Sequence, residues 1–161
     1  MQDAHIAQLD AIHEWFTRST RNLTEEDSTF APTKEMFTVA QQVAHAAQTV
    51  DWFFEGAFAK EGFSEDFEGM EKDIRKVTSL ASARTRFDKA IEDAKKVVRK
   101  HSDEEWEQPL PAGPIMGGMP RHSIIGALVD HTAHHRGALT VYARMVGKTA
   151  PIPYMEMEVD A

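Results

Sequence analysis

Two histidines that could share a metal ion stand four residues apart in the segment His131-Thr-Ala-His-His135-Arg136. On an α-helix, positions i and i+4 lie one turn apart on the same face. A buried imidazole needs a hydrogen-bond partner or a metal ion, because an unpaired polar group in a core costs about 2 kcal/mol or more. Two imidazoles on one apolar face therefore favour a metal site. The other side chains of this face are apolar or aromatic: Ile124, Leu128, Leu139, Tyr142 and Val146.

A third imidazole is available in His45, midway along an Ala-rich and nearly apolar segment. The polar side chains that we place on the same side of this segment are all uncharged: Gln41 one turn before His45, with Gln48 and Thr49 one turn after. We interpret this narrow polar strip as the lining of an internal cavity. Taken alone, His45 is better explained as a core histidine bonded to a glutamine or a carbonyl group. Together with the histidine pair, it completes three imidazole ligands and leaves an open position, as in catalytic metal sites.

Six further side chains are candidates for contacts with the metal ligands or with a substrate: Gln41, Gln48, Asp130, His134, Arg136 and Tyr142. His134 lies about 100° around the helix from its neighbours, so we expect it to pair with Asp130 at the surface. For Arg136 we favour a salt bridge on the helix surface over a substrate contact, because arginine is seldom buried. For Tyr142 we favour plain packing, because it falls on the apolar face.

Other metal chemistries fit less well. Thr132 stands where the zinc-protease helix H-E-x-x-H has its glutamate, so peptide hydrolysis has no obvious general base. A ferritin-like di-iron site needs two Glu-x-x-His motifs, and the sequence has none. A hemerythrin-like site is suggested by the spacing of His101 and Glu105, but Ser102 is expected to end the helix between them. We expect the remaining histidines at the surface: His5, His13, His101 and His122.

The hydrophobic periodicity predicts four main helices, over about residues 2–19, 33–58, 80–98 and 120–147. Polar turns are expected at 22–32 and, with a short helical piece, at 62–76. Residues 109–120 hold four of the seven prolines and three of the nine glycines, so they cannot form a helix or strand interior. We interpret them as a crossover before the last helix, and residues 151–155 as a tail that packs back. No strand-like alternation is present, and the predicted fold is an all-α four-helix bundle.

Composition limits the function. The chain of 161 residues fits one domain, 1–161, and its net charge of −8 disfavours nucleic acid as a partner. It contains no cysteine, so any metal must be held by histidine, carboxylate and water. We see no signal peptide and no apolar stretch long enough to span a membrane. The expectation is a cytoplasmic protein.

These motifs resemble the DinB (damage-inducible) superfamily over nearly the whole chain. The resemblance is carried by His45, by His131-Thr-Ala-His-His135-Arg136-Gly137 and by the ending Gly147-Lys148 with Pro151. Ala138 departs from the pattern, because relatives often have glutamine there. The resemblance implies a four-helix bundle, often a homodimer, in which His45, His131 and His135 bind one divalent metal ion. Nickel and zinc are the ions that it favours, with iron as a further candidate.

Relatives of this superfamily include bacillithiol S-transferases and mycothiol-dependent maleylpyruvate isomerase. The resemblance therefore implies a metal-dependent transferase or isomerase that uses a low-molecular-weight thiol and an electrophile. A divalent cation stabilises the ionised form of a coordinated thiol, which supplies a thiolate without a protein cysteine. The same ion can ionise water for hydrolysis. A non-catalytic metal-binding or stress-response protein is the remaining alternative.

Overall fold

The computed structural model describes residues 1–156, and residues 157–161 of the predicted domain lie outside the described part. Four long helices form the bundle, as predicted, and the described residues contain no strand beyond an isolated bridge between Pro109 and Pro120. The long helices are α1 (Gln2–Thr20), α2 (Val39–Phe58), α4 (Leu80–Lys100) and α6 (Ser123–Met145). Shorter elements connect them: the 3-10 turn η1 (Glu25–Asp27), α3 (Phe67–Arg75) and α5 (Asp103–Glu107).

The start of α2 differs from the prediction, which placed it near Thr33. The helix begins at Val39, because Thr38 caps it: the Thr38 hydroxyl accepts a hydrogen bond from the Gln41 N–H, and the Gln41 side chain accepts one from the Thr38 N–H. This reciprocal capping box satisfies backbone groups that the first turn leaves unpaired. The last helix likewise begins at Ser123 rather than at Pro120.

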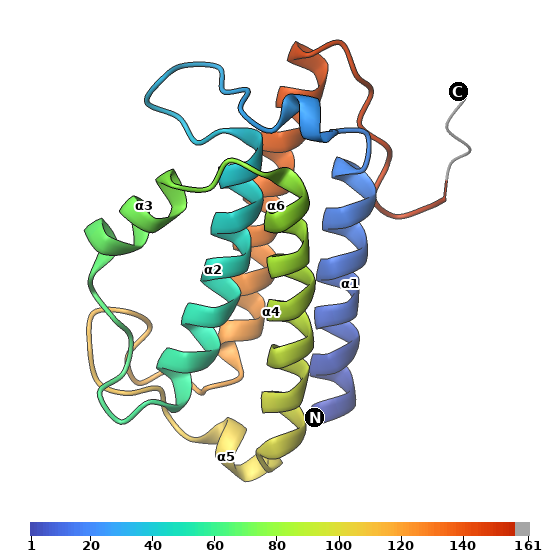
Figure 1. Cartoon of the computed structure of the whole chain (residues 1–161). Helices are drawn as coiled ribbons and strands as arrows, with labels where there is room; N and C mark the ends of the chain where they lie inside the picture. Colours follow the sequence, from blue (N-terminus) through green and yellow to red (C-terminus); the bar gives the residue numbers. More distant parts are fainter. Residues whose placement is uncertain (157–161) are drawn as a thin grey trace.

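The four long helices surround one core in the order α1, α4, α2, α6 (Figure 1). Neighbouring α1 and α4 are antiparallel, since Asp10, midway along α1, pairs with Lys95, and Arg84 donates to the Thr20 carbonyl at the end of α1. In contrast, α2 and α4 are parallel: Arg86 faces Asp51, and further along the Phe58 ring stacks on His101. The chain direction therefore runs up, down, down, up.

This order explains the long connections. Because α2 and α4 point the same way, the chain must return along the bundle between them, and α3 lies on that path outside the ring of long helices (Figure 1). The 101–122 segment then crosses the lower end of the bundle to α6, through α5 and the predicted Gly/Pro-rich crossover. Ser102, which ends the preceding helix as expected, forms a capping box with Glu105 at the start of α5.

Helix α2 is the most deeply buried element, as its apolar circumference predicts. Its core face includes Val43 and Val50, both almost inaccessible, and the rings of Phe16 and Phe87 pack at 4.7 Å elsewhere in the same core. Because α4, α6 and α3 all contact α2, even its polar residues Gln42 and Thr49 are buried. Within residues 1–156, none of the helices combines the length and the apolar character needed to cross a membrane.

Candidate metal centre

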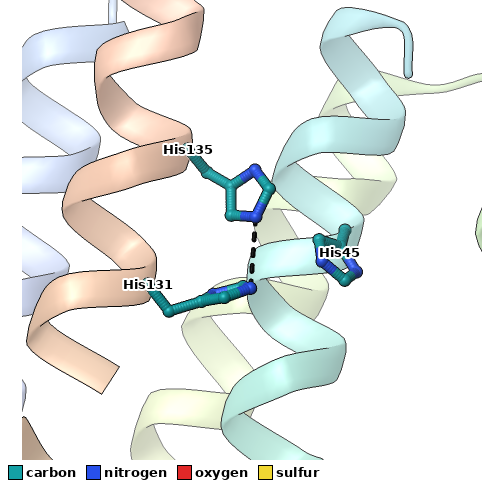
Figure 2. Close-up of side chains that lie close together, drawn as sticks. All are labelled: His45, His131 and His135. Atoms are coloured by element: carbon teal, nitrogen blue, oxygen red, sulfur yellow. Dashed lines mark hydrogen bonds between the residues drawn. The ribbon is translucent and has the colours of Figure 1, made fainter. Parts of the chain in front are cut away.

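Helices α2 and α6 bring the three predicted histidines together. The two helices pack antiparallel, which places His45 of α2 opposite the His131–His135 face of α6 (Figure 2). One ring nitrogen from each histidine lies within 4.8 Å of those of the other two. The spacing of four in α6 stacks its two imidazoles on one face, and the antiparallel packing supplies the third from the opposite helix.

The rings of His131 and His135 are oriented so that their Nε2 atoms lie close together. The Nε2 atoms of His131 and His135 are 3.1 Å apart, and the His45 ring lies 5.1 Å and 4.8 Å from theirs, centroid to centroid. Two imidazole ligands of one tetrahedral zinc ion would have their nitrogens about 3.3 Å apart, from Zn–N bonds of about 2.0 Å. The spacing of this pair is therefore close to that of two ligands on one ion.

Burial favours the neutral form of all three imidazoles. Burial lowers the pKa of His45. Burial, with the neighbouring histidines adding to it, lowers the pKa of His131 to about 4 and that of His135 to about 3. Neutral imidazole is the form that binds metals, because the ligand nitrogen must carry a free lone pair.

Gln42 is a neighbour of the cluster that the sequence analysis missed. Its side-chain oxygen lies 2.5 Å from Nδ1 of His135, and both residues are buried. A signal was present, because Gln42, His45 and Thr49 follow one another at helical steps of three and four and so share one face. Thr49, on the same face, lies 3.4 Å from Nε2 of His131.

Gln41 and Gln48 were predicted to line a cavity, and this is wrong in part: the two side chains hold α3 against α2. Gln41 donates to the Arg75 carbonyl, and Gln48 donates to the Met70 carbonyl. Gln48 also lies beside His45 and acts to raise its pKa. The error arose because the acceptors of both amides are backbone carbonyls of another element, α3, and a pattern within α2 alone cannot show this.

On α6, His134 is exposed and is not among the three clustered ligands, as the 100° argument predicted. The predicted pair with Asp130 does not form, since no hydrogen bond or ion pair links the two in the described part of the chain. Instead the His134 ring meets that of His135 edge-on at 4.9 Å. Asp130 is exposed and makes no contact with the three histidines among residues 1–156.

Arg136 lies on the opposite side of α6, where it borders a cavity of about 160 Å³ beside Trp15 and Tyr154. Its guanidinium sits 5.8 Å from the Tyr154 ring, and within residues 1–156 it forms neither the expected salt bridge nor a contact with the histidine cluster. Its role as a substrate contact at this centre therefore finds no support. Tyr142, by contrast, is buried on the cluster side and hydrogen-bonded to Gln42.

The other four histidines are partly buried rather than on the open surface. His13 bonds Asp88, and His101 bonds Glu105 while stacking on Phe58. His5 packs against Trp106 and His122 across the lower end of the bundle, and burial lowers its pKa. Ring stacking accounts for this burial, because the apolar face of an imidazole can pack against another ring. The sequence prediction placed these histidines at the surface because it treated them as polar.

A carboxylate also reaches the cluster electrostatically, although the sequence predicted none there. The charge of Glu71, in α3, acts to raise the pKa of His45, and burial outweighs it. The Glu71 carboxylate is itself held by Arg75 at 3.0 Å. The donor set thus consists of three neutral nitrogens with no thiolate and no carboxylate among the clustered ligand atoms, which suits Zn, Ni, Cu or Fe ions.

Fold and site together define a helical-bundle protein with three histidines clustered between two antiparallel helices. The family model described as the DinB superfamily matches residues 8–139, and the chain belongs to this superfamily. The resemblance inferred from the sequence is confirmed.

Solved structures agree with the fold. A DinB-like protein from Bacillus cereus ATCC 10987 has a TM-score of 0.74 and 18% identity, with 92% of this chain and 95% of that chain covered. YfiT from Bacillus subtilis has a TM-score of 0.70 and 16% identity, with 92% and 89% covered. YfiT is described as a probable metal-dependent hydrolase with an unusual four-helix bundle topology. Among curated proteins, none matches this chain.

Proposed function

We propose that His45, His131 and His135 bind one divalent metal ion and leave part of its coordination sphere open. The observation that carries this proposal is the cluster of three neutral imidazoles with their ligand atoms within 4.8 Å of one another. Three protein ligands with an open position are typical of catalytic rather than structural sites. Nickel and zinc are the ions we favour, and iron is the next candidate.

We propose further that the centre serves a thiol S-transferase or isomerase. When bound, the ion lowers the pKa of a coordinated thiol, so that a thiolate is available at neutral pH. The three imidazoles contribute no charge, so the site retains its attraction for an anionic ligand. The thiol must be a small molecule, because the chain has no cysteine. In a transfer, the thiol would lose its proton to solvent, and its sulfur would form a bond to an electrophilic carbon of the second substrate while the bond from that carbon to a leaving group breaks. In an isomerisation, the sulfur would add to a carbon–carbon double bond and be expelled again once that bond has rotated.

Within residues 1–156, no carboxylate stands among the clustered ligand atoms to act as a general base, which supports a thiol over water as the nucleophile. A thiol has a pKa of about 8.5, whereas water has one of about 16, so a thiol needs far less help to ionise. The carboxylate whose charge reaches the cluster, Glu71, is engaged by Arg75. Metal-dependent hydrolysis is the second candidate, which the description of YfiT favours. It would require Glu71 to leave Arg75 and accept a proton from water.

The metal site itself is tested by single alanine substitutions. His131→Ala and His135→Ala should each abolish binding of one ion per chain, because each removes a ligand nitrogen. His134→Ala is the matched control, because it removes an exposed imidazole from the same turn and should leave binding intact. Metal content after purification and titration calorimetry give the measurement. Equal losses at all three positions would contradict the assignment of the ligands.

The chemistry is tested with the cobalt-substituted protein. A small thiol should shift the ligand-field spectrum and should react faster with an electrophile in the presence of wild-type protein than with His45→Ala. A spectral shift without a difference in rate would leave a metal-binding protein without turnover. If no thiol changes the spectrum, the transferase proposal fails, and ester or amide hydrolysis that is lost in Glu71→Gln would support the second candidate.

The proposed partners are a small-molecule thiol, an electrophile and, from the family resemblance, a second copy of the chain.

A further inference from the structure

We propose that Tyr142 and Gln42 are positioning residues, which fix the proton of His135 on Nδ1 and leave the Nε2 lone pair facing the cluster. The tautomer follows from hydrogen bonds in the chain itself. Its effect on metal affinity rests on the proposed metal centre. The arrangement links the backbone of Phe37, before α2, to a side chain of α6.

The direction of each hydrogen bond follows from the one before it. The Phe37 carbonyl can only accept, so the Tyr142 hydroxyl, 3.2 Å away, must donate its one proton there. The Tyr142 oxygen is then free to accept from the Gln42 amide NH₂ at 3.3 Å. This fixes the orientation of the amide and turns its carbonyl oxygen toward Nδ1 of His135. A carbonyl can only accept, so Nδ1 must carry the proton.

A neutral imidazole has a single ring proton, so a proton on Nδ1 leaves Nε2 with its lone pair. That nitrogen lies 3.1 Å from Nε2 of His131, within the space shared by the three histidines. Metal-binding histidines commonly donate their other N–H to an oxygen acceptor, which sets the tautomer and the ring orientation. Here the acceptor is an amide whose own orientation is determined two hydrogen bonds away, by a main-chain carbonyl.

We call the hydrogen-bonded series Phe37–Tyr142–Gln42–His135 the relay. Its burial makes it difficult for water to replace any of its members. The exposed fractions are 2% for Tyr142, 7% for Gln42 and 8% for His135. The Phe30 ring packs edge-on against Tyr142 at 5.9 Å. A reversed Gln42 amide would point its NH₂ at His135 and its oxygen at a hydroxyl already committed to Phe37, so one buried group would lose its partner. An unsatisfied buried polar group costs about 1–3 kcal/mol, which favours the orientation observed.

The test compares two variants that each remove one buried hydroxyl from α6. Tyr142→Phe breaks the relay. Thr132→Val is the matched control, since the Thr132 hydroxyl is equally buried and donates to the Leu128 carbonyl of its own helix. Nitrogen-15 NMR of the full metal-free chain reports which ring nitrogen of His135 carries the proton. Zinc titration calorimetry then reports affinity, with circular dichroism to verify folding.

We expect wild type and Thr132→Val to show the proton on Nδ1, whereas Tyr142→Phe should show a substantial share on Nε2 and bind zinc about tenfold more weakly. In the Tyr142→Phe background, Gln42→Glu should restore the Nδ1 proton, because a carboxylate can only accept. An Nδ1 proton that persists in Tyr142→Phe with unchanged zinc affinity would overturn the relay and leave the metal centre standing. Wild-type protein that binds no zinc would overturn the metal centre, while the NMR comparison would still decide the tautomer.

Discussion

At the scale of single residues, the chemistry of the centre depends on buried imidazoles whose protonation is disfavoured by that burial. His131 and His135 lie against each other between two helices, and a charge on either would be poorly solvated and repelled by the other. The free energy that keeps them neutral is supplied by folding. The metal-free protein must therefore respond to pH.

The pH dependence has a definite sign. The folded-state pKa values of about 4 and about 3 lie below the ordinary value of 6.5, so between pH 6.5 and 4 the unfolded chain binds more protons. The free energy of unfolding should thus fall as pH decreases through this window, by at most about 1.4 kcal/mol per pH unit for each proton. Urea unfolding of the metal-free protein from pH 7.5 to 5 measures it. A His131→Gln, His135→Gln double variant should show a weaker dependence, and the lowered pKa values of His45 and His5 account for a remainder.

Residue types and spacing were sufficient to predict the three clustered histidines, because i, i+4 geometry is local and an imidazole in an apolar face is conspicuous. Gln42 could not be separated from Gln41 and Gln48 in the same way. Which glutamine meets His135 depends on how α2 is rotated against α6, and which ones meet α3 depends on a short helix whose position the sequence pattern leaves open.

At the scale of elements, two local sequence signals compete at the start of α2. The proline at position 32 indicates a helix start near Thr33, whereas Thr38 and Gln41 can form a capping box. The capping box prevails and sets the first turn at Val39. The intervening residues form a turn in which the Met36 N–H bonds the Thr33 carbonyl. This turn leads to the Phe37 carbonyl, which accepts a hydrogen bond from the Tyr142 hydroxyl, so the position of the cap also places one end of the relay.

The contribution of Thr38 as the cap of α2 can be compared with that of Thr33, where the sequence analysis placed the helix start. Thr38→Ala should lower the free energy of unfolding by about 1 kcal/mol, because the side-chain acceptor for the Gln41 N–H is lost. Thr33→Ala removes an exposed threonine that caps no helix and should change it by less than about 0.5 kcal/mol. Denaturant unfolding gives both values. A larger loss for Thr33→Ala would favour the earlier helix start.

At the scale of the whole molecule, the helical pattern predicted four long helices and an all-α class but not which helices are neighbours. Periodicity identifies an apolar face and not the partner of that face. The parallel pairs of this bundle depend on the long connections, and their paths are set by tertiary contacts such as the docking of α3 through Gln41 and Gln48. The Gly/Pro-rich crossover was recognisable because those residues exclude helix.

Burial across the bundle makes one pair of substitutions decisive. Val43→Asp places a carboxylate at a position that is 1% exposed, which costs several kcal/mol, a large part of the 5–15 kcal/mol that stabilises a typical domain. We expect loss of the helical circular dichroism signal or of soluble protein. Val141→Asp is the control, since that valine of α6 is 53% exposed and should tolerate the change. A native-like Val43→Asp protein would mean that α2 is not the centre of the core.

The connection between the two histidine-bearing helices has a consequence for how the molecule assembles. Gln42 and His135 touch although they are 93 residues apart in the chain. Bringing such distant segments together is entropically costly and happens only when α2 and α6 dock, so isolated helices offer no complete set of ligands. An incoming ion would then meet its ligands after the bundle has closed. The bound ion would therefore slow unfolding rather than speed folding, because its bonds would form only after the folding transition state.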